Sequence, residues 1–298
     1  MRTRRSWKLI MKWTRGGRQN IEDRRGSSGR ALRMGGLGLG GVLVLAVLSL
    51  VTGVDFMSLD PGGTPGGGIA PPERVGTSGP VASTPEEEHL IDMVDAVVGD
   101  GQQLWSDVLG DRYPPTRAVL FRDAIDSACG FAQSATGPFY CPADRKIYLD
   151  LGFFDDLDRG LGAPGDFAQA YVLAHELGHH VQTVLGIESR VRQLQAANEG
   201  ERNALSVRME LQADCLAGVW GHHAKAGQRR VQLEEGDVEE GLRAASAIGD
   251  DRLQRMQTGR VAPDRFTHGT SQQRVEWFTR GLRTGDPDAC NTFGGGTS

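Results

Sequence analysis

The stretch AHELGHH at residues 174–180 places two histidines four positions apart, with a glutamate directly after the first. On an α-helix, residues four apart differ by only about 40° of rotation, so His175 and His179 project from one side, one turn apart. Two imidazoles in that arrangement are suited to bind one zinc ion, and Glu176, rotated by about 100°, is placed to take a proton from water at the metal. The spacing predicts a hydrolytic zinc site. The alternative is a polar patch on an ordinary helix.

A catalytic zinc site needs a third protein ligand and leaves a fourth position for water. The stretch ELQAD places Glu210 and Asp214 four residues apart, on one face of a second predicted helix. We expect Glu210 to be the third ligand of a single Zn²⁺ ion, and Asp214 to accept a hydrogen bond from the second nitrogen of a ligand histidine. The neighbours Ala213, Leu216 and Ala217 are apolar, which favours a packed site over the alternative, a solvated acidic face.

Helix and strand signals around these motifs indicate an α+β domain. Residues 113–153 contain two short runs rich in β-formers, RAVLF and KIYLDL, and predict a small sheet of about three strands before the motif helix. Asp166 with Gln169 is a plausible capping box for that helix, and Gly186 ends it. The expected fold class is therefore α+β, a mostly helical domain with a small β-sheet before the HExxH helix. Further helices are predicted from Thr84, over about 201–225, from Asp237 and from Thr270.

The N-terminal region differs in composition from the rest of the chain. Residues 1–34 hold eleven Lys and Arg against one Glu and one Asp, whereas residues 35–54 are uncharged and rich in Leu, Val and Gly. Such a segment of twenty residues rises about 30 Å as a helix, enough to cross a bilayer. We expect a basic cytoplasmic arm at 1–34, one transmembrane helix at 35–54, a Gly- and Pro-rich linker at 55–83 and the catalytic domain at 84–298.

The charge bias across the segment 35–54 predicts its orientation in the membrane. Arginines before it and acids after it place the N-terminus in the cytoplasm and the catalytic domain outside the cytoplasmic membrane. A cleaved signal peptide and a buried core helix are the alternatives. The basic arm also suits nucleic-acid binding, but it has no recognisable binding fold and the membrane topology explains the same charges, so we expect no nucleic-acid partner.

Four cysteines are present, Cys129, Cys141, Cys215 and Cys290, and none of them forms a CxxC motif, which argues against a thiolate zinc site. In an extracytoplasmic domain they can pair in three ways. Cys129 and Cys141 flank a short loop and are natural local partners, which leaves Cys215 with Cys290. The alternative is free, buried cysteines that behave as small hydrophobic residues.

The two motifs together resemble the HExxH and ExxxD helices of gluzincins, and more of the chain is similar to one family, the bacterial neutral zinc metallopeptidases. The similar segments are IEDRRGSSG, CG…GPFYCPADRKIYLDLGFF, AHELGHHVQ, ELQADCLAGVW, AASAIGDDRLQ and FTHGTSQQRVEWF. They cover nearly everything outside the linker. The resemblance implies a zincin-like peptidase that acts on a peptide or protein substrate, with His175, His179 and Glu210 as zinc ligands and Glu176 as catalytic base.

Two further site hypotheses accompany this resemblance. Gluzincins hold an extended substrate along a strand edge, which residues 146–151 resemble; an ordinary strand of the sheet is the alternative. His268, just before a predicted helix start, is a candidate donor to the developing oxyanion, as against a loop histidine without such a role. The competing functions are a zinc-binding, non-hydrolytic scaffold at the membrane and an acidic partner surface without metal.

Overall fold

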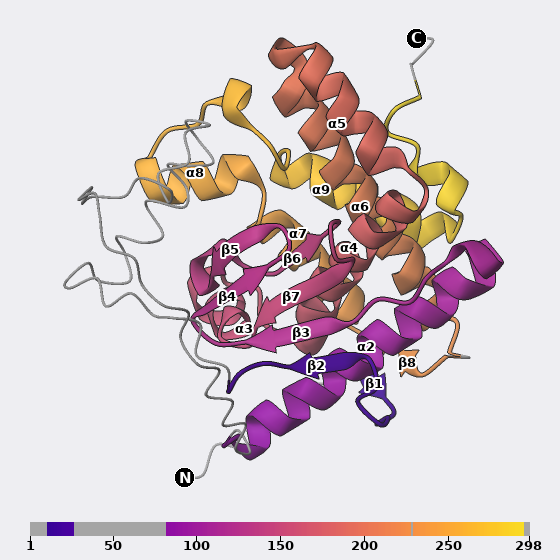
Figure 1. Cartoon of the computed structure of the whole chain (residues 1–298). Helices are drawn as coiled ribbons and strands as arrows, with labels where there is room; N and C mark the ends of the chain where they lie inside the picture. The colour runs from indigo at the N-terminus through magenta and orange to yellow at the C-terminus, as the bar shows by residue number, and fades with distance from the viewer. Residues whose placement is uncertain (1–10, 27–81, 228, 295–298) are drawn as a thin grey trace, which may run out of the picture.

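The computed structural model describes residues 11–26, 82–227 and 229–294, and it shows a small sheet beside a group of helices (Figure 1). The described part of the chain is α+β and mostly helical, as the sequence predicts. Its helices are α2 Pro85–Leu109, α3 Phe153–Asp155, α4 Asp166–Val184, α5 Ile187–Ala197, α6 Arg202–Lys225, α7 Asp237–Ala247, α8 Asp250–Thr258 and α9 Ser271–Thr284.

The main sheet has four strands in the order β2-β3-β7-β6, in which β2, β3 and β7 run parallel and β6 runs antiparallel to β7. Two smaller pairs accompany it, the hairpin β4-β5 and the two-residue contact of β1 with β8. The predicted sheet region 113–153 supplies five strands, of which three enter the main sheet. The strand bounds are β1 Lys12–Trp13, β2 Ile21–Asp23, β3 Ala118–Phe121, β4 Ala124–Ser127, β5 Gly130–Gln133, β6 Phe139–Cys141, β7 Lys146–Asp150 and β8 Val231–Gln232.

The core lies where α4 is enclosed by other helices. α4 contacts α2, α6 and α7, and its aromatic residues Phe167 and Tyr171 are wholly buried. Phe167 stacks on Trp220 of α6 with ring centroids 5.8 Å apart, and Phe278 of α9 meets Tyr171 edge to face at 5.1 Å. Because apolar groups surround this helix, every polar side chain on it needs a partner within the protein.

The predicted helix starts at Thr84 and Thr270 are confirmed, each with a complete capping box. The predicted capping box at Asp166 is wrong, because Asp166 is itself the first helical residue of α4 and the helix start has no side-chain cap. Instead, the carboxylate of Glu240 in α7 accepts the backbone N–H of Phe167 at 3.2 Å. A tertiary contact thus satisfies a free N–H that the local sequence leaves unpaired.

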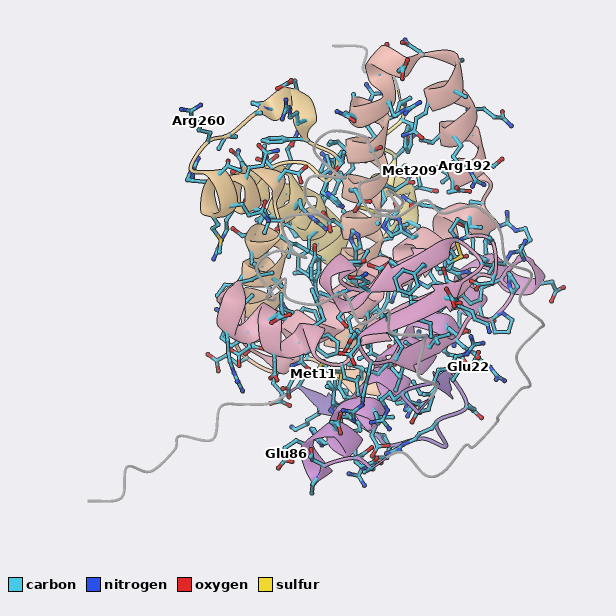
Figure 2. All side chains as sticks on the ribbon, turned by 60° about the vertical axis from the view of Figure 1, so that its left-hand side comes forward. Met11, Glu22, Glu86, Arg192, Met209 and Arg260 are labelled. Carbon is cyan, nitrogen blue, oxygen red and sulfur yellow. A yellow bond between two sulfur atoms is a disulfide. The ribbon has the colours of Figure 1, made fainter. Side chains whose placement is uncertain are left out.

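Residues 11–26, which the sequence assigns to the basic arm, are folded into this domain. β2 pairs with β3 along the edge of the main sheet, as the indigo ribbon in Figure 1 shows, and β1 pairs with β8. The side chain of Met11 is only 2% exposed, and Figure 2 shows Met11 and Glu22 against the body of the molecule. The domain therefore includes residues before position 84.

Buried carboxylates of α2 hold the N-terminal segment in place. Asp92 pairs with Arg15 at 3.1 Å and with Arg18 at 2.5 Å. Asp95, which is 1% exposed, accepts the backbone N–H of Asn20 at 3.2 Å and its side-chain amide at 2.9 Å. Leaving a buried carboxylate without its partner costs on the order of 3–5 kcal/mol, so these contacts favour the docked segment.

The predicted transmembrane helix at 35–54 lies outside the described residues, as does nearly all of the predicted linker at 55–83. Among the helices that the structure describes, none combines the length and the apolar character needed to cross a membrane.

Candidate metal centre

α4 presents the AHELGHH motif inside the domain. His175 and Glu176 are each 6% exposed. The imidazole rings of His175 and His179 lie perpendicular to each other with centroids 4.7 Å apart, and their Nε2 atoms are 3.1 Å apart. The two histidines therefore point to one place, as their spacing of one helical turn predicts.

α6 brings a carboxylate to the same place. Glu210 lies with Oε2 at 3.1 Å from Nε2 of His175 and Oε1 at 3.6 Å from Nε2 of His179. Ligand atoms of the three residues all lie within 4.8 Å of one another. Gly178, inside the motif, allows this approach: a Cβ there would lie 3.0 Å from the backbone of Ala213, so a larger residue would push α6 away.

This donor set fits a zinc ion. Nδ1 of His175 is 2.8 Å from the Asp214 carboxylate, and Nδ1 of His179 is 2.8 Å from Oε1 of Gln182. Both partners are acceptors, so each neutral imidazole carries its hydrogen on Nδ1 and turns the lone pair of Nε2 towards Glu210. Three acceptor atoms in such proximity repel one another unless a proton or a cation lies among them. With Zn–N bonds of about 2.0–2.1 Å, two nitrogens of a tetrahedral site are roughly 3.3 Å apart. The observed Nε2–Nε2 distance is 3.1 Å.

Asp214 is the centre of a buried polar cluster. Besides His175, it accepts the Tyr171 hydroxyl at 2.5 Å and two N–H groups of Arg274 at 2.9 Å each. The sequence predicts the contact between Asp214 and a ligand histidine but not Tyr171, Arg274 or Gln182. Spacing offers a signal for two of them, because Tyr171 lies one turn before His175 and Gln182 lies three residues after the second motif histidine. The sequence spacing gives no such signal for Arg274.

The charges of the site follow from its burial and its close partners. Burial disfavours the charged form of His175, but the carboxylates of Asp214 and Glu210 raise its pKa to about 10. Burial would raise the pKa of Glu210, yet His179 and His268 hold that pKa well below its usual range. A proton therefore competes for the position that a metal ion would take, and metal binding would release it.

Glu176 lies beside the ligand cluster, at the edge of the main sheet. Burial raises its pKa, against the opposing effects of the two motif histidines and of the backbone of Tyr140 in β6. β6 is the edge strand of the sheet on this side. The predicted substrate edge at 146–151 is wrong, because β7 lies between β3 and β6 with both of its edges paired.

The third histidine of the motif fixes that edge strand to α4. His180 is wholly buried, with Nδ1 at 2.9 Å from the Tyr140 hydroxyl and Nε2 at 2.8 Å from the carbonyl of Pro114. Burial lowers the pKa of His180, so a neutral ring donates to Pro114 and accepts from Tyr140. This pair of contacts ties the segment before the sheet and its edge strand to the helix that carries the metal-binding motif.

His268 approaches the cluster from the loop before α9. Asp250 orients it: one oxygen accepts the backbone N–H groups of Thr267, His268 and Gly269 at 2.7, 2.7 and 3.1 Å. The other oxygen lies 3.3 Å from Nδ1 of His268, whose side chain is 36% exposed. Burial lowers the pKa of His268, but the nearby charge of Glu210 and the bond to Asp250 raise it above the usual value. The charges of His268 and Glu210 thus act on each other, each favouring the charged form of the other.

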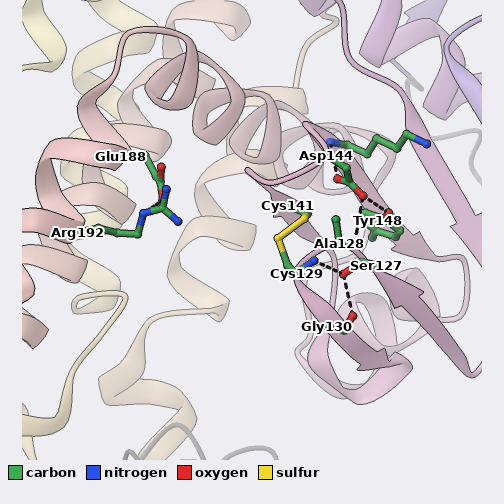
Figure 3. The surroundings of a disulfide bond; sticks show 10 residues. Ser127, Ala128, Cys129, Gly130, Cys141, Asp144, Tyr148, Glu188 and Arg192 are labelled. Atoms are coloured by element: carbon green, nitrogen blue, oxygen red, sulfur yellow. Dashed lines mark hydrogen bonds and ion pairs between the residues drawn. A yellow bond between two sulfur atoms is a disulfide. The ribbon is translucent and has the colours of Figure 1, made fainter.

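Both disulfides that the sequence favours are present, and no cysteine is free. Cys129, in the turn between β4 and β5, is bonded to Cys141 at the end of β6, as Figure 3 shows. Cys215 in α6 is bonded to Cys290, 75 residues later, in the turn Pro287–Cys290 that follows α9. One bond therefore fastens the hairpin to the edge strand beside Glu176, and the other fastens the C-terminal segment to the helix that carries Glu210.

Comparisons with known proteins agree with this chemistry. The family described as "Putative neutral zinc metallopeptidase" matches residues 11–293, a range that begins with the N-terminal strands. "Uncharacterized protein YpfJ" of Escherichia coli K12 is 48% identical over 285 residues, which cover 92% of this chain and 96% of the relative. "Uncharacterized protein Rv2575" of Mycobacterium tuberculosis H37Rv is 44% identical over 182 residues, 58% of this chain and 61% of the relative. No solved structure gives a significant match.

We expect the purified chain to bind one zinc ion, because three candidate ligands converge, which is the number of protein ligands in a catalytic zinc site. His175→Ala and Glu210→Ala should each lose most of the zinc, as measured by elemental analysis of metal per chain. Two matched substitutions outside the cluster, His89→Ala on the exposed surface of α2 and Glu188→Ala on α5, should retain it. A parent protein without zinc after purification in zinc-supplemented buffer would contradict the site.

Proposed function

The chain belongs to the neutral zinc metallopeptidase family, and on this premise we propose that it is a zinc-dependent peptidase with a zincin-like catalytic domain. Its substrate would be a peptide or a protein. The observation that carries the proposal is the convergence of His175, His179 and Glu210 in one largely buried cluster, with Glu176 beside it and outside the ligand set.

The roles of the residues follow from this arrangement. His175, His179 and Glu210 would hold the ion, which when bound supplies a Lewis acid for the scissile carbonyl and lowers the pKa of water. Glu176 accepts a proton from the attacking water and delivers it to the leaving amine. Burial raises the pKa of Glu176, which makes this carboxylate a stronger proton acceptor than an exposed one.

The free edge of β6 is the place where an extended substrate would lie. Among the described strands, β6 ends the main sheet with one side unpaired, and it packs against α4, the helix that carries Glu176. Pairing of a substrate with a strand edge depends on main-chain hydrogen bonds, so it would tolerate many sequences. The disulfide at Cys141 and the contacts of His180 hold this strand against α4.

Glu176→Gln tests the assignment of the base. The amide cannot accept the proton, so kcat should fall at least about 100-fold, while zinc content stays at the parent value because Glu176 is not a ligand. Cleavage is measured on a library of fluorogenic peptides, and metal content is measured on the same samples. Undiminished cleavage by the variant would contradict the role of Glu176.

The competing function, a zinc-binding scaffold without hydrolysis, predicts a different result for the unsubstituted protein. Such a protein would hold one zinc ion and cleave no member of the library, and Glu176→Gln would then change nothing that the assay measures. The buried position of Glu176, next to a candidate set of three ligands in the described part of the chain, favours the enzyme.

For His268 we propose the role of donor to the oxyanion that develops as the carbonyl is attacked. Its Nδ1 lies 3.0 Å from the Thr267 hydroxyl and 3.3 Å from Asp250, so Nε2 is the ring nitrogen that would donate, and the charge of Glu210 raises the pKa of the ring. His268→Gln should lower kcat about 100- to 1,000-fold with little change in KM or zinc content. His89→Gln, at an exposed histidine, is the matched control. Loss of zinc from His268→Gln, or an unchanged kcat, would count against this role.

The pairing of β2 with β3 bears on how the chain is arranged at a membrane. A chain that crosses a bilayer once between residues 26 and 82 leaves 11–26 on the side opposite to the rest of the domain, where β2 cannot pair with β3. The pairing of β2 with β3 therefore favours a topology other than the single span expected from the sequence. We propose that residues 11–26 and 82–294 lie on the same side of the membrane, and the two disulfides favour an oxidising, extracytoplasmic side.

Two single-cysteine additions test this topology with a membrane-impermeant maleimide on intact spheroplasts. A Cβ at Gly17 meets no atom within 4 Å, and Met256 is 55% exposed, so Gly17→Cys and Met256→Cys should both fold and present a free thiol. The native cysteines are all paired and give little background. We expect both variants to be labelled equally before and after lysis.

Labelling of Met256→Cys alone in intact spheroplasts, with Gly17→Cys labelled only after lysis, would overturn the same-side proposal. If both variants react only after lysis, the two segments share a side but that side is the cytoplasm, which would contradict the extracytoplasmic assignment.

A further inference from the structure

The two motif histidines have different partners for the nitrogen that faces away from the metal position. Nδ1 of His175 meets the Asp214 carboxylate, whereas Nδ1 of His179 meets the amide oxygen of Gln182 at 2.8 Å. Gln182 is wholly buried and lies three residues after His179 on α4. A hydrogen bond to this second nitrogen fixes both the tautomer of a ligand imidazole and the rotation of its ring.

The direction of the Gln182 amide is fixed by its other partners. Its Nε2 donates to the carbonyl of Met209 at 2.7 Å and to Oε1 of Gln212 at 3.0 Å, both on α6. Because two acceptors take the two N–H bonds, a reversed amide would place its oxygen against both of them and its nitrogen against the N–H of His179. The carbonyl must therefore face His179, and α6 determines this orientation.

The same network continues to the C-terminal segment. Nε2 of Gln212 donates to the backbone carbonyl of Cys290 at 3.0 Å, and Cys290 is held on α6 by its disulfide to Cys215, three residues after Gln212. Gln212 is 7% exposed and Cys290 is 1% exposed, so water cannot readily replace either group. The disulfide thus anchors the acceptor that keeps the Gln212 amide turned towards Gln182.

We propose that Gln182 is the positioning residue of the metal ligand His179, and that Gln212 together with the Cys215–Cys290 disulfide holds Gln182 in its working orientation. The proposal rests on the proposed function only in requiring that His179 bind the metal ion. It assigns to the C-terminal turn a share in metal affinity, although no residue of that turn belongs to the ligand cluster.

The test is the dissociation constant for zinc, measured on the full chain by competition with a chromophoric chelator. Gln182→Met keeps the length of the side chain and removes the acceptor for His179, so the dissociation constant should rise about 10- to 100-fold. Gln212→Met and the double variant Cys215→Ala/Cys290→Ala change residues outside the ligand cluster. These variants should raise the dissociation constant for zinc by a smaller factor, roughly two- to tenfold.

Gln195→Met is the matched control. Gln195 lies on α5, and its amide also bridges to the neighbouring helix α6, donating to the carbonyl of Arg202 and the hydroxyl of Ser206. It has no contact with the ligand cluster, so its substitution should leave the zinc dissociation constant unchanged. The visible absorption of Co²⁺-substituted protein gives a second readout, because the spectrum reports ligand geometry. It should shift in Gln182→Met and not in Gln195→Met.

The outcomes separate this proposal from the function on which it rests. A parent that binds no zinc contradicts the metal centre itself, and a parent that binds zinc without cleaving peptides contradicts only the peptidase. Gln182→Met that folds and binds zinc within twofold of the parent overturns the positioning role, as does an equal loss in Gln195→Met. If Gln182→Met fails to fold, Gln212→Met decides: a dissociation constant equal to that of the parent overturns the proposal, because Gln212 is the residue that holds the Gln182 amide.

Discussion

The candidate site depends on one buried ion pair, Asp214 with Arg274, whose side chains are 0% and 2% exposed. Removing a carboxylate and a guanidinium from water costs several kcal/mol for each ion, and this cost is offset only when every hydrogen-bonding position is filled. Asp214 meets that condition by accepting two hydrogen bonds from Arg274, one from the hydroxyl of Tyr171 and one from Nδ1–H of His175. Asp214 lies on α6 and these partners on α4 and α9, so the ion pair links the packing of the three helices to the orientation of His175.

The ion pair can form because α4, α6 and α9 approach one another closely at glycine residues. A Cβ at Gly281 of α9 would lie 1.9 Å from the carbonyl oxygen of Cys215, and one at Gly218 of α6 would lie 2.1 Å from the backbone of α9. Gly178 allows the corresponding approach of α4 to Ala213. Each glycine within a helix costs about 0.8–1 kcal/mol of helix stability relative to alanine. The short interhelical distances that they permit bring polar groups from three helices within hydrogen-bonding reach, and this packing offsets that cost.

Those parts of the site that local spacing determines are predictable from the sequence. His175 and His179 lie one turn apart on any helix, and so do Glu210 and Asp214, so each pair follows from α-helical periodicity alone. The number of protein ligands that a zinc ion needs, together with the family resemblance, predicts that the two pairs lie close together. Arg274 is different: it lies 60 residues from Asp214 on an amphipathic helix, where an arginine ordinarily faces solvent. Its burial is decided by tertiary packing, which no local pattern encodes.

The N-terminal segment shows why the composition of a short stretch does not predict the contacts that it makes with distant parts of the chain. β2 has only three residues, IED, without the apolar alternation of a typical strand, and its position depends on contacts with α2 some seventy residues away. The arginines that suggest a cytoplasmic arm have other partners in the fold: Arg15 and Arg18 pair with Asp92, and Arg25, 7% exposed, pairs with Asp23. The positive-inside rule uses Lys and Arg beside an apolar segment as evidence of orientation. Arginines that neutralise carboxylates of their own domain are retained by the stability of that domain, and they therefore carry no information about the side of the membrane on which it lies.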